Sequence, residues 1–357
     1  MTRLILCLIA ALAAAPAVAQ VKDEYNEELG LPYWAPGRGQ VDHDALRRRS
    51  LVVLETQYSA FSQATADLTD AAVAYCDQGA PRAAVEQAFR DTWLSWAPLD
   101  SYQFGPVELN GAALAVNFWP DKKNFVGRAL RDLLAQPENA QRDPAVIAAG
   151  SAAAQGLPAI ELLLYTDAPE CPAIIGISGF LNDMAGTVYH DWFDDGGWAD
   201  LARAAGPDNP VYLSPQEFTK TLYTALDFGL IRVADQRLGR PLGTYERSFP
   251  TRAEGWRSGL TAEIIDAQLA GIAVMIRDGF AGDIREPDRA WVLRLIEQTR
   301  ARIDKIGMPI PEAVKDPQTR IRVEAVRSKV DQIRHALAED VGPGLGVDTG
   351  FSPADGD

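Results

Sequence analysis

Histidine and cysteine are scarce in this sequence, with three of each among 357 residues. This shortage argues against a zinc site built only from imidazole, because such a site gathers three or four ligands in one place. Basic residues are also in deficit: 34 Lys and Arg stand against 49 Asp and Glu, for a formal net charge of −15. Since nucleic acids and anionic lipid surfaces are bound by clustered basic side chains, neither is an expected partner.

Several common catalytic signatures are also missing. The sequence contains no His-Glu-x-x-His zinc motif and no Gly-x-Ser-x-Gly nucleophile elbow. The glycine-rich run 342–346 lacks the Lys and the Ser or Thr that a phosphate-binding loop requires. A conventional zinc peptidase, a hydrolase of the nucleophile-elbow type and a P-loop protein are therefore not expected.

The first nineteen residues have the pattern of a secretory signal peptide. Arg3 provides the positive start, Leu4 to Ala15 form an apolar run, and Ala17 to Ala19 form a small-residue cleavage site. The apolar run is about a dozen residues long, whereas a helix that spans a bilayer needs about 20. No second apolar run follows, which disfavours the alternative of an N-terminal membrane anchor. We predict a periplasmic protein, not transmembrane after signal removal, with residues 20–42 as an irregular arm.

Two cysteines remain in the mature chain, Cys76 and Cys171. An exported protein meets an oxidising compartment, so the two can form a disulfide. Both lie next to turn residues, and we favour the disulfide over the alternative of two buried free thiols. In the chain-entropy model, a closed loop of this length contributes about 4–5 kcal/mol of stability.

Apolar residues recur at spacings of three and four along most of the chain, and almost no stretch alternates with period two. The sequence therefore predicts an all-α protein. Gly and Pro cluster around 196–210, which divides the chain into a first helical bundle, 43–200, and a second, 211–357, with a glycine-rich tail. The similar number of helices in the two halves points to an ancient duplication. The expected helices are 43–76, 82–99, 122–136, 144–165, 174–195, 214–238, 251–280, 287–306 and 316–340.

Six segments carry a combination of residues that resembles the imelysin-like family, also classified as peptidase family M75. Their order and spacing carry the resemblance, which covers most of the mature chain. The segments are Tyr58–Cys76, Trp93–Pro106, Asn117–Asn124 (NFWPDKKN), Gly156–Tyr165 (GLPAIELLLY), Ala234–Gly243 (ADQRLGRPLG) and Leu345–Asp357.

The resemblance implies an exported protein of two helical bundles, tied to iron regulation and iron uptake, with a site near the interface between the bundles. The family's marker is Gly-x-His-x-x-Glu. Gly156 and Glu161 match this marker, but Pro158 stands where His is expected. Because proline has no side-chain ligand atom, a site that depends on that imidazole cannot form in the same way.

Glu161 is the residue that the resemblance carries over, as a metal ligand or a general base. The structural alternative is that Pro158 starts a helix whose free N–H groups attract the nearby carboxylate. Three further residues are candidates for binding a small ligand. Asp121 also suits a helix N-cap, while for Asp235 and Arg237 we prefer an ion pair at a helix end.

Three functions remain open at this stage. The first is an exported binding protein for iron, another divalent metal or a small ligand, with its cleft between the bundles and an iron-uptake protein of the envelope as partner. The second is the metal-dependent peptidase that the family label implies. The third is an envelope interaction protein whose family site has decayed.

Overall fold

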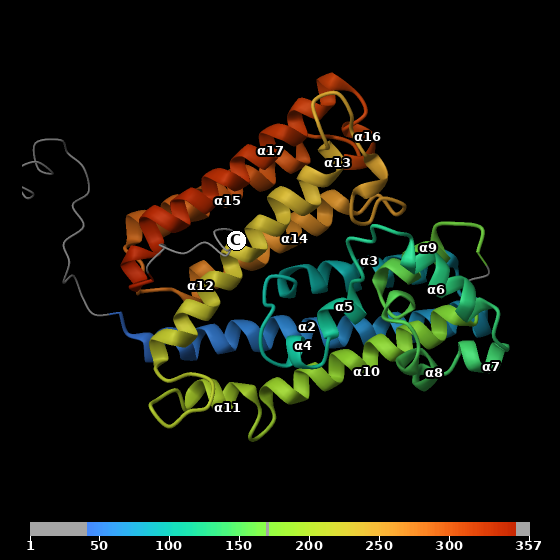
Figure 1. Cartoon of the computed structure of the whole chain (residues 1–357), viewed down its shortest axis with the longest axis horizontal. Helices are drawn as coiled ribbons and strands as arrows, with labels where there is room; N and C mark the ends of the chain where they lie inside the picture. Colours follow the sequence, from blue (N-terminus) through green and yellow to red (C-terminus); the bar gives the residue numbers. More distant parts are fainter. Residues whose placement is uncertain (1–40, 169–170, 348–357) are drawn as a thin grey trace, which may run out of the picture. The chain divides into compact units, whose positions relative to one another are not determined.

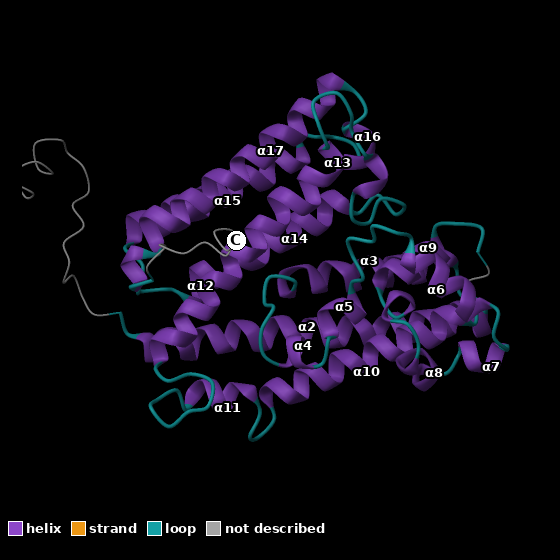
Figure 2. Ribbon diagram, in the orientation of Figure 1, coloured by secondary structure: helices purple, strands orange, loops and turns teal. Residues whose placement is uncertain are grey.

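The computed structural model describes residues 41–168 and 171–347. Every regular element in these two stretches is a helix, and the helices are joined by loops and turns (Figure 2). The prediction of an all-α protein is therefore confirmed. The predicted signal peptide, nearly all of the predicted arm and the end of the C-terminal tail lie outside the described residues.

The long helix α2 (His43–Gln78) packs against α3 (Arg82–Leu99) and α10 (Ala173–Phe193). Its first turn is capped by the Asp42 side chain, and it ends at Gly79 in the left-handed conformation, with φ of 75°. Its inward face carries apolar side chains at helical spacing, as the sequence predicts. The buried side chains on this face include Leu46, Leu54, Tyr58, Phe61, Leu68 and Ala72.

Between α3 and α12 the chain forms short helices in addition to α10. These are α4 (Pro106–Leu109), α5 (Ala112–Val116), α6 (Phe125–Leu134), α7 (Glu138–Gln141), α8 (Pro144–Ala149), the 3-10 turn η1 (Ala152–Ala154), α9 (Leu157–Leu164) and α11 (Trp198–Arg203). The predicted single helix 144–165 is wrong, because the structure divides it into α8, η1 and α9. Ser151 caps η1 and Gly156 precedes α9, so each short element starts anew at a small residue.

The second half of the chain is built around α12, α14, α15 and α17; α15 and α17 run side by side (Figure 1). Three of its helices end in or continue into π-helical turns. The elements are α12 (Pro215–Ile231), η2 (Arg232–Gly239), α13 (Arg240–Leu242), η3 (Pro250–Arg252), α14 (Thr261–Val274), η4 (Met275–Gly279), α15 (Glu286–Asp304), α16 (Ile310–Ala313), α17 (Pro317–Ala336), η5 (Leu337–Val341) and η6 (Pro343–Leu345).

The predicted helix 251–280 is wrong at its start, because α14 begins only at Thr261. Residues 250–260 instead form the 3-10 turn η3 and a series of turns, which we call the 250–260 loop. Gly255 and Gly259 have φ of 61° and 77°, values that glycine adopts readily and that interrupt a right-handed helix. This loop proves central to the candidate site.

Helices from the two predicted bundles contact one another directly. The helix α3 packs against α14, and α2 packs against α12 and η4. From Asp42 onward, the described residues belong to one compact unit. The assignment of 43–200 and 211–357 to separate bundles, and their origin by duplication, stays a prediction.

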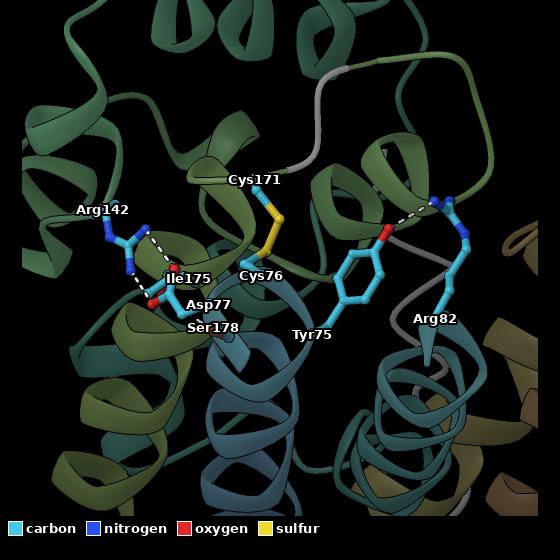
Figure 3. Close-up of a disulfide and its surroundings, with 8 residues drawn as sticks. All are labelled: Tyr75, Cys76, Asp77, Arg82, Arg142, Cys171, Ile175 and Ser178. Atoms are coloured by element: carbon cyan, nitrogen blue, oxygen red, sulfur yellow. Dashed lines mark hydrogen bonds and ion pairs between the residues drawn. A yellow bond between two sulfur atoms is a disulfide. The ribbon is translucent and has the colours of Figure 1, made fainter. Parts of the chain in front are cut away.

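A disulfide joins Cys76, near the end of α2, to Cys171, just before α10 (Figure 3). The two Cα atoms lie 5.8 Å apart, and 95 positions separate the residues in sequence. Next to it, Arg142 donates to Asp77, with Nη1 3.1 Å from Oδ1. The disulfide holds the end of α2 against the residues just before α10, and the ion pair holds it against the end of α7. Within residues 41–168 and 171–347, no helix is long and apolar enough to cross a membrane.

Candidate functional site

The run Gly156–Glu161 forms the start of α9. A Cβ atom at Gly156 would lie 2.2 Å from the carbonyl oxygen of Val116, at the end of α5. No side chain fits in that space, so glycine allows α9 to begin directly against α5. Pro158 lies in the first turn of α9, where its missing N–H removes no helical hydrogen bond. Together these two residues position Glu161 one turn further along α9.

Glu161 is buried, with 2% of its surface exposed, and its carboxylate is held by the 250–260 loop. Its Oε1 accepts hydrogen bonds from the backbone N–H groups of Arg257 and Ser258, at 3.0 and 2.9 Å, and from the Ser258 hydroxyl, at 2.8 Å. Its Oε2 lies 3.7 Å from Nη1 of Arg257. The carboxylate therefore joins α9 to the loop, and these hydrogen bonds do not go to the first turn of its own helix.

The environment of Glu161 shifts its protonation in a definite direction. Burial raises the pKa of Glu161 above its ordinary value of 4.5, although the Ser258 and Arg257 donors oppose this shift. Because three of its hydrogen bonds converge on Oε1, this oxygen has little capacity left to accept a proton from a water molecule.

A pocket of about 370 Å³ lies beside Glu161. This volume falls within the range of small-molecule sites. Its lining comes from both halves of the chain and combines aromatic and charged side chains. The aromatic members are Trp93, Phe118, Trp119 and Trp256, and the charged members are Asp121, Glu161, Arg240, Arg252 and Arg257.

Asp121 lines the pocket and lies shortly before α6, whose N-cap residue is Asn124. Its Oδ1 accepts hydrogen bonds from the backbone N–H groups of Lys123 and Phe125, at 3.2 and 2.8 Å, and its Oδ2 accepts one from Val126 at 3.0 Å. These contacts satisfy N–H groups at the first turn of α6 and explain why that helix begins at Phe125 and not at the predicted position 122.

The 250–260 loop is anchored from its other side by a buried ionic network. Arg237 on η2 is fully buried; its Nε donates to Oε2 of Glu254 at 2.5 Å, and its Nη2 donates to Oδ2 of Asp100 at 2.6 Å. Its Nη1 donates to Gln268. The Asn117 amide donates to Oε1 of Glu254 at 2.6 Å. The loop is therefore fixed by Glu254 to η2 and to Asn117 at the end of α5, and by Glu161 to α9.

Arg237 and Glu254, the pair at the centre of this network, both stay charged. Burial alone would lower the pKa of Arg237 and raise the pKa of Glu254, but the attraction between them reverses both shifts, with Asp100 adding to the effect on Arg237 and Arg232 to the effect on Glu254. The pKa of Arg237 is raised and that of Glu254 is lowered. Asp100 also pairs with Arg232, whose Nε lies 2.5 Å from Oδ2, so the buried charges balance.

The predicted ligand-binding residues separate into two groups in the structure. Asp121 lines the pocket together with Glu161 and with Pro158 of the family's marker run. Arg237 is buried in the ionic network, and Asp235 pairs with Arg327 at 3.0 Å on the surface. Neither of the latter two belongs to the pocket lining.

Sequence reasoning missed several lining residues, chiefly Trp119, Arg252, Trp256 and Arg257. The last three fall within the predicted helix 251–280, in which the helical pattern does not mark them as a site. The available signal was the placement of two arginines and a tryptophan around Gly255, a pattern typical of a functional loop rather than of a helix interior.

The family resemblance raises the question of whether these residues could hold a metal ion. A protein-bound metal needs several ligands in one coordination sphere. In the part of the chain that the structure describes, no three His, Cys, Asp or Glu side chains are grouped so that they could hold one. The side chains present therefore do not fit a metal held by the protein alone, and the role of Glu161 as a metal ligand stays a prediction.

The fold and the pocket define an all-helical protein with a small-molecule-sized site where α9 meets the 250–260 loop. The chain belongs to the imelysin family, peptidase family M75: the sequence model of this family matches residues 54–338, well over half of the chain. No curated protein sequence matches it.

Two solved structures have a similar fold. An imelysin-like protein from Psychrobacter arcticum 273-4 is 18% identical, with a TM-score of 0.73 over 89% of this chain and 100% of the other. A protein from Parabacteroides distasonis ATCC 8503, whose name describes it as an iron-regulated protein A precursor, is 14% identical, with a TM-score of 0.62 over 86% of this chain and 97% of the other. At these identities the likeness establishes the fold alone.

Proposed function

We propose that this chain is an exported binding protein of the imelysin family, which takes its ligand into the pocket beside Glu161 as part of iron acquisition. The observation that carries the proposal is the pocket itself. It has the volume of a small-molecule site, its walls are aromatic and charged, and it lies at the family's marker run. An iron-uptake protein of the envelope is the proposed partner.

Binding is favoured over peptide hydrolysis by the state of Glu161. A hydrolase needs a base that can take a proton from an attacking water. The Oε1 of Glu161 already accepts three hydrogen bonds, and Pro158 occupies the position of the marker imidazole. Oε1 is thus committed to shaping the pocket, and the marker run lacks the imidazole on which the family site depends.

Export and the link to iron have separate support. Residues 1–19 have a signal-peptide pattern, and the disulfide between Cys76 and Cys171 is typical of an oxidising compartment. The link to iron comes from the family resemblance and from the name of the Parabacteroides distasonis protein.

The proposal is tested by closing the pocket. Thr251 is exposed and lines the pocket, so Thr251→Trp places a large side chain in the opening. Thr224 on α12 is equally exposed but lies outside the lining, and Thr224→Trp is the matched control. Both proteins are expressed in a strain from which the gene has been deleted, and growth and iron uptake are measured under iron limitation.

We expect wild type and Thr224→Trp to restore iron uptake, and Thr251→Trp to fail although it reaches the same level in the periplasm. Full restoration by Thr251→Trp would contradict the proposal. Turnover of peptides by the purified protein, abolished by a chelator and insensitive to Thr251→Trp, would replace it with the peptidase hypothesis.

A further inference from the structure

We propose that the pocket beside Glu161 binds an organic polycarboxylate through Arg240, Arg252 and Arg257. This inference rests on the proposed function, since it names the ligand class of the same pocket. Three guanidinium groups line a space of about 370 Å³. Guanidinium groups bind carboxylates through paired, charge-assisted hydrogen bonds, which is the contact that such a ligand would make.

Two of the three guanidinium groups are free to bind. Among the described residues, neither Arg240 nor Arg252 has a carboxylate partner or a side-chain hydrogen bond. Nε of Arg240 is buried and lacks a hydrogen-bond acceptor. Burial and the nearby charge of Arg252 lower the pKa of Arg240. A buried donor without an acceptor, beside a second positive charge, is costly unless a ligand supplies negative oxygens.

The two acidic side chains of the pocket do not satisfy these arginines. Asp121 accepts three backbone N–H hydrogen bonds at α6, and Oε1 of Glu161 accepts three from Arg257 and Ser258. Apart from a contact with Arg257 at 3.7 Å, Oε2 of Glu161 keeps its acceptor capacity, but Arg240 and Arg252 together present far more N–H donors. The pocket therefore has more free donors than free acceptors, which selects an anionic, oxygen-rich ligand over a bare cation.

The walls favour an organic molecule over a small inorganic anion. Trp93, Trp119 and Trp256 provide apolar surface, and Arg257 lies 4.4 Å from the ring centre of Trp256. A phosphate or sulfate ion would neither cover these walls nor fill the pocket, whereas a carbon skeleton with several carboxylates would do both.

This ligand class also fits the absence of a three-ligand metal group among the described residues. Carboxylate oxygens are good ligands for hard cations. A polycarboxylate can therefore carry such a cation into the pocket with its own oxygens, while the arginines hold the remaining carboxylates. The missing imidazole at Pro158 would then need no replacement from the protein.

The test measures citrate binding to the purified mature protein by calorimetry, with sulfate and phosphate as inorganic comparisons. Arg252→Gln removes one guanidinium from the pocket lining. Arg247→Gln is the matched control, because Arg247 and Arg252 both lie over the ring of Phe249, at 4.9 and 3.8 Å, but Arg247 is outside the pocket. Both arginines are exposed, so we expect both variants to fold, and thermal melts check this.

We expect Arg252→Gln to weaken citrate binding about tenfold or more and Arg247→Gln to change it less than about twofold. Added sodium chloride should weaken binding further, because Arg252 is solvent-exposed. No citrate binding at millimolar concentration, equal binding by Arg252→Gln, or equally tight binding of sulfate or phosphate would each overturn the inference.

The two proposals can fail separately. If citrate does not bind but Thr251→Trp still abolishes iron uptake, the ligand class is wrong and the binding function stands. If citrate binds as expected but Thr251→Trp restores iron uptake fully, the ligand class stands and the link to iron is wrong. A further titration with ferric citrate shows whether the ligand enters with its cation.

Discussion

Replacement of Arg237 by Met should strongly destabilise the protein. The substitution keeps an unbranched side chain of similar length but removes a charge that is fully buried between two carboxylates. Asp100 keeps its pair with Arg232 at 2.5 Å, so the charge left without a cation is that of Glu254. Breaking one buried ion pair in this way costs about 3–5 kcal/mol, and we expect a loss of this size and not twice as much.

The loss is measured by chemical denaturation at pH 7, with the midpoint and the m-value fitted separately. Asp235→Asn is the control on the same π-helical turn. The side chains of Asp235 and of its partner Arg327 are both exposed to solvent, so this substitution should lower the free energy of unfolding by only about 0–1 kcal/mol. Adding Glu254→Gln to Arg237→Met should recover part of the loss, because it removes the unpaired charge. A loss below about 1 kcal/mol, or no recovery in the double variant, would refute the reasoning.

The same pair predicts how the effect depends on pH. The pKa of Glu254 in the folded protein lies below its ordinary value of 4.5. Its contribution to stability is therefore fully present above the unfolded pKa and is lost as the pH falls through the folded pKa. The destabilisation by Arg237→Met should accordingly shrink as denaturation is repeated at increasingly acidic pH, and a constant difference from pH 7 to pH 3 would argue against a charge effect.

Three further substitutions test the neighbourhood of the pocket and the disulfide. Gly156→Ala should lower the free energy of unfolding by about 1–3 kcal/mol or more, because its Cβ would meet backbone oxygen at 2.2 Å; Gly186→Ala, in α10 with nothing within 4 Å, should be neutral or stabilising in the same denaturation assay. Cys76→Ser leaves Cys171 unpaired. Its free energy of unfolding should be about 4–5 kcal/mol lower than that of the oxidised wild-type protein and equal to that of the reduced wild-type protein. Glu161→Gln should change how the free energy of unfolding depends on pH. Because the pKa of Glu161 is raised, the stability of the wild-type protein falls as the pH rises above about 4.5. The variant lacks this loss, so its stability relative to wild type should increase over that range, and parallel pH profiles would contradict this.

The sequence predicts the helices well where burial is one-sided and continuous. Along α2, the positions from Leu46 to Ala72 follow one face, and the predicted helix 43–76 agrees closely with His43–Gln78. The prediction of helix boundaries fails where the residues favour a helix but tertiary contacts require the backbone to turn. In the segment 144–165 the close contact between Gly156 and Val116 decides the break, and a contact between positions forty residues apart leaves no trace in local periodicity.

The candidate site could be predicted from the sequence only in part. The family resemblance located Gly156, Pro158 and Glu161, and all three lie at or beside the pocket. The guanidinium groups were harder to find, because Arg252 and Arg257 belong to a loop whose sequence looks like part of the helix α14. Only Gly255 and Gly259, with their positive φ angles, separate that loop from the helix.

The structure also shows which substitution can test for direct contact with the ligand. Removing the Glu161 carboxylate releases the backbone of Arg257 and Ser258, so the 250–260 loop and the pocket would lose their shape whether or not Glu161 touches the ligand. A loss of binding in Glu161→Ala would therefore be ambiguous. Arg252 is exposed and makes no hydrogen bond or ion pair with the described residues, so its removal leaves the loop anchored by Glu254 and Glu161. Loss of binding in Arg252→Gln, together with an unchanged melting temperature, would reflect a direct contact between the guanidinium and the ligand.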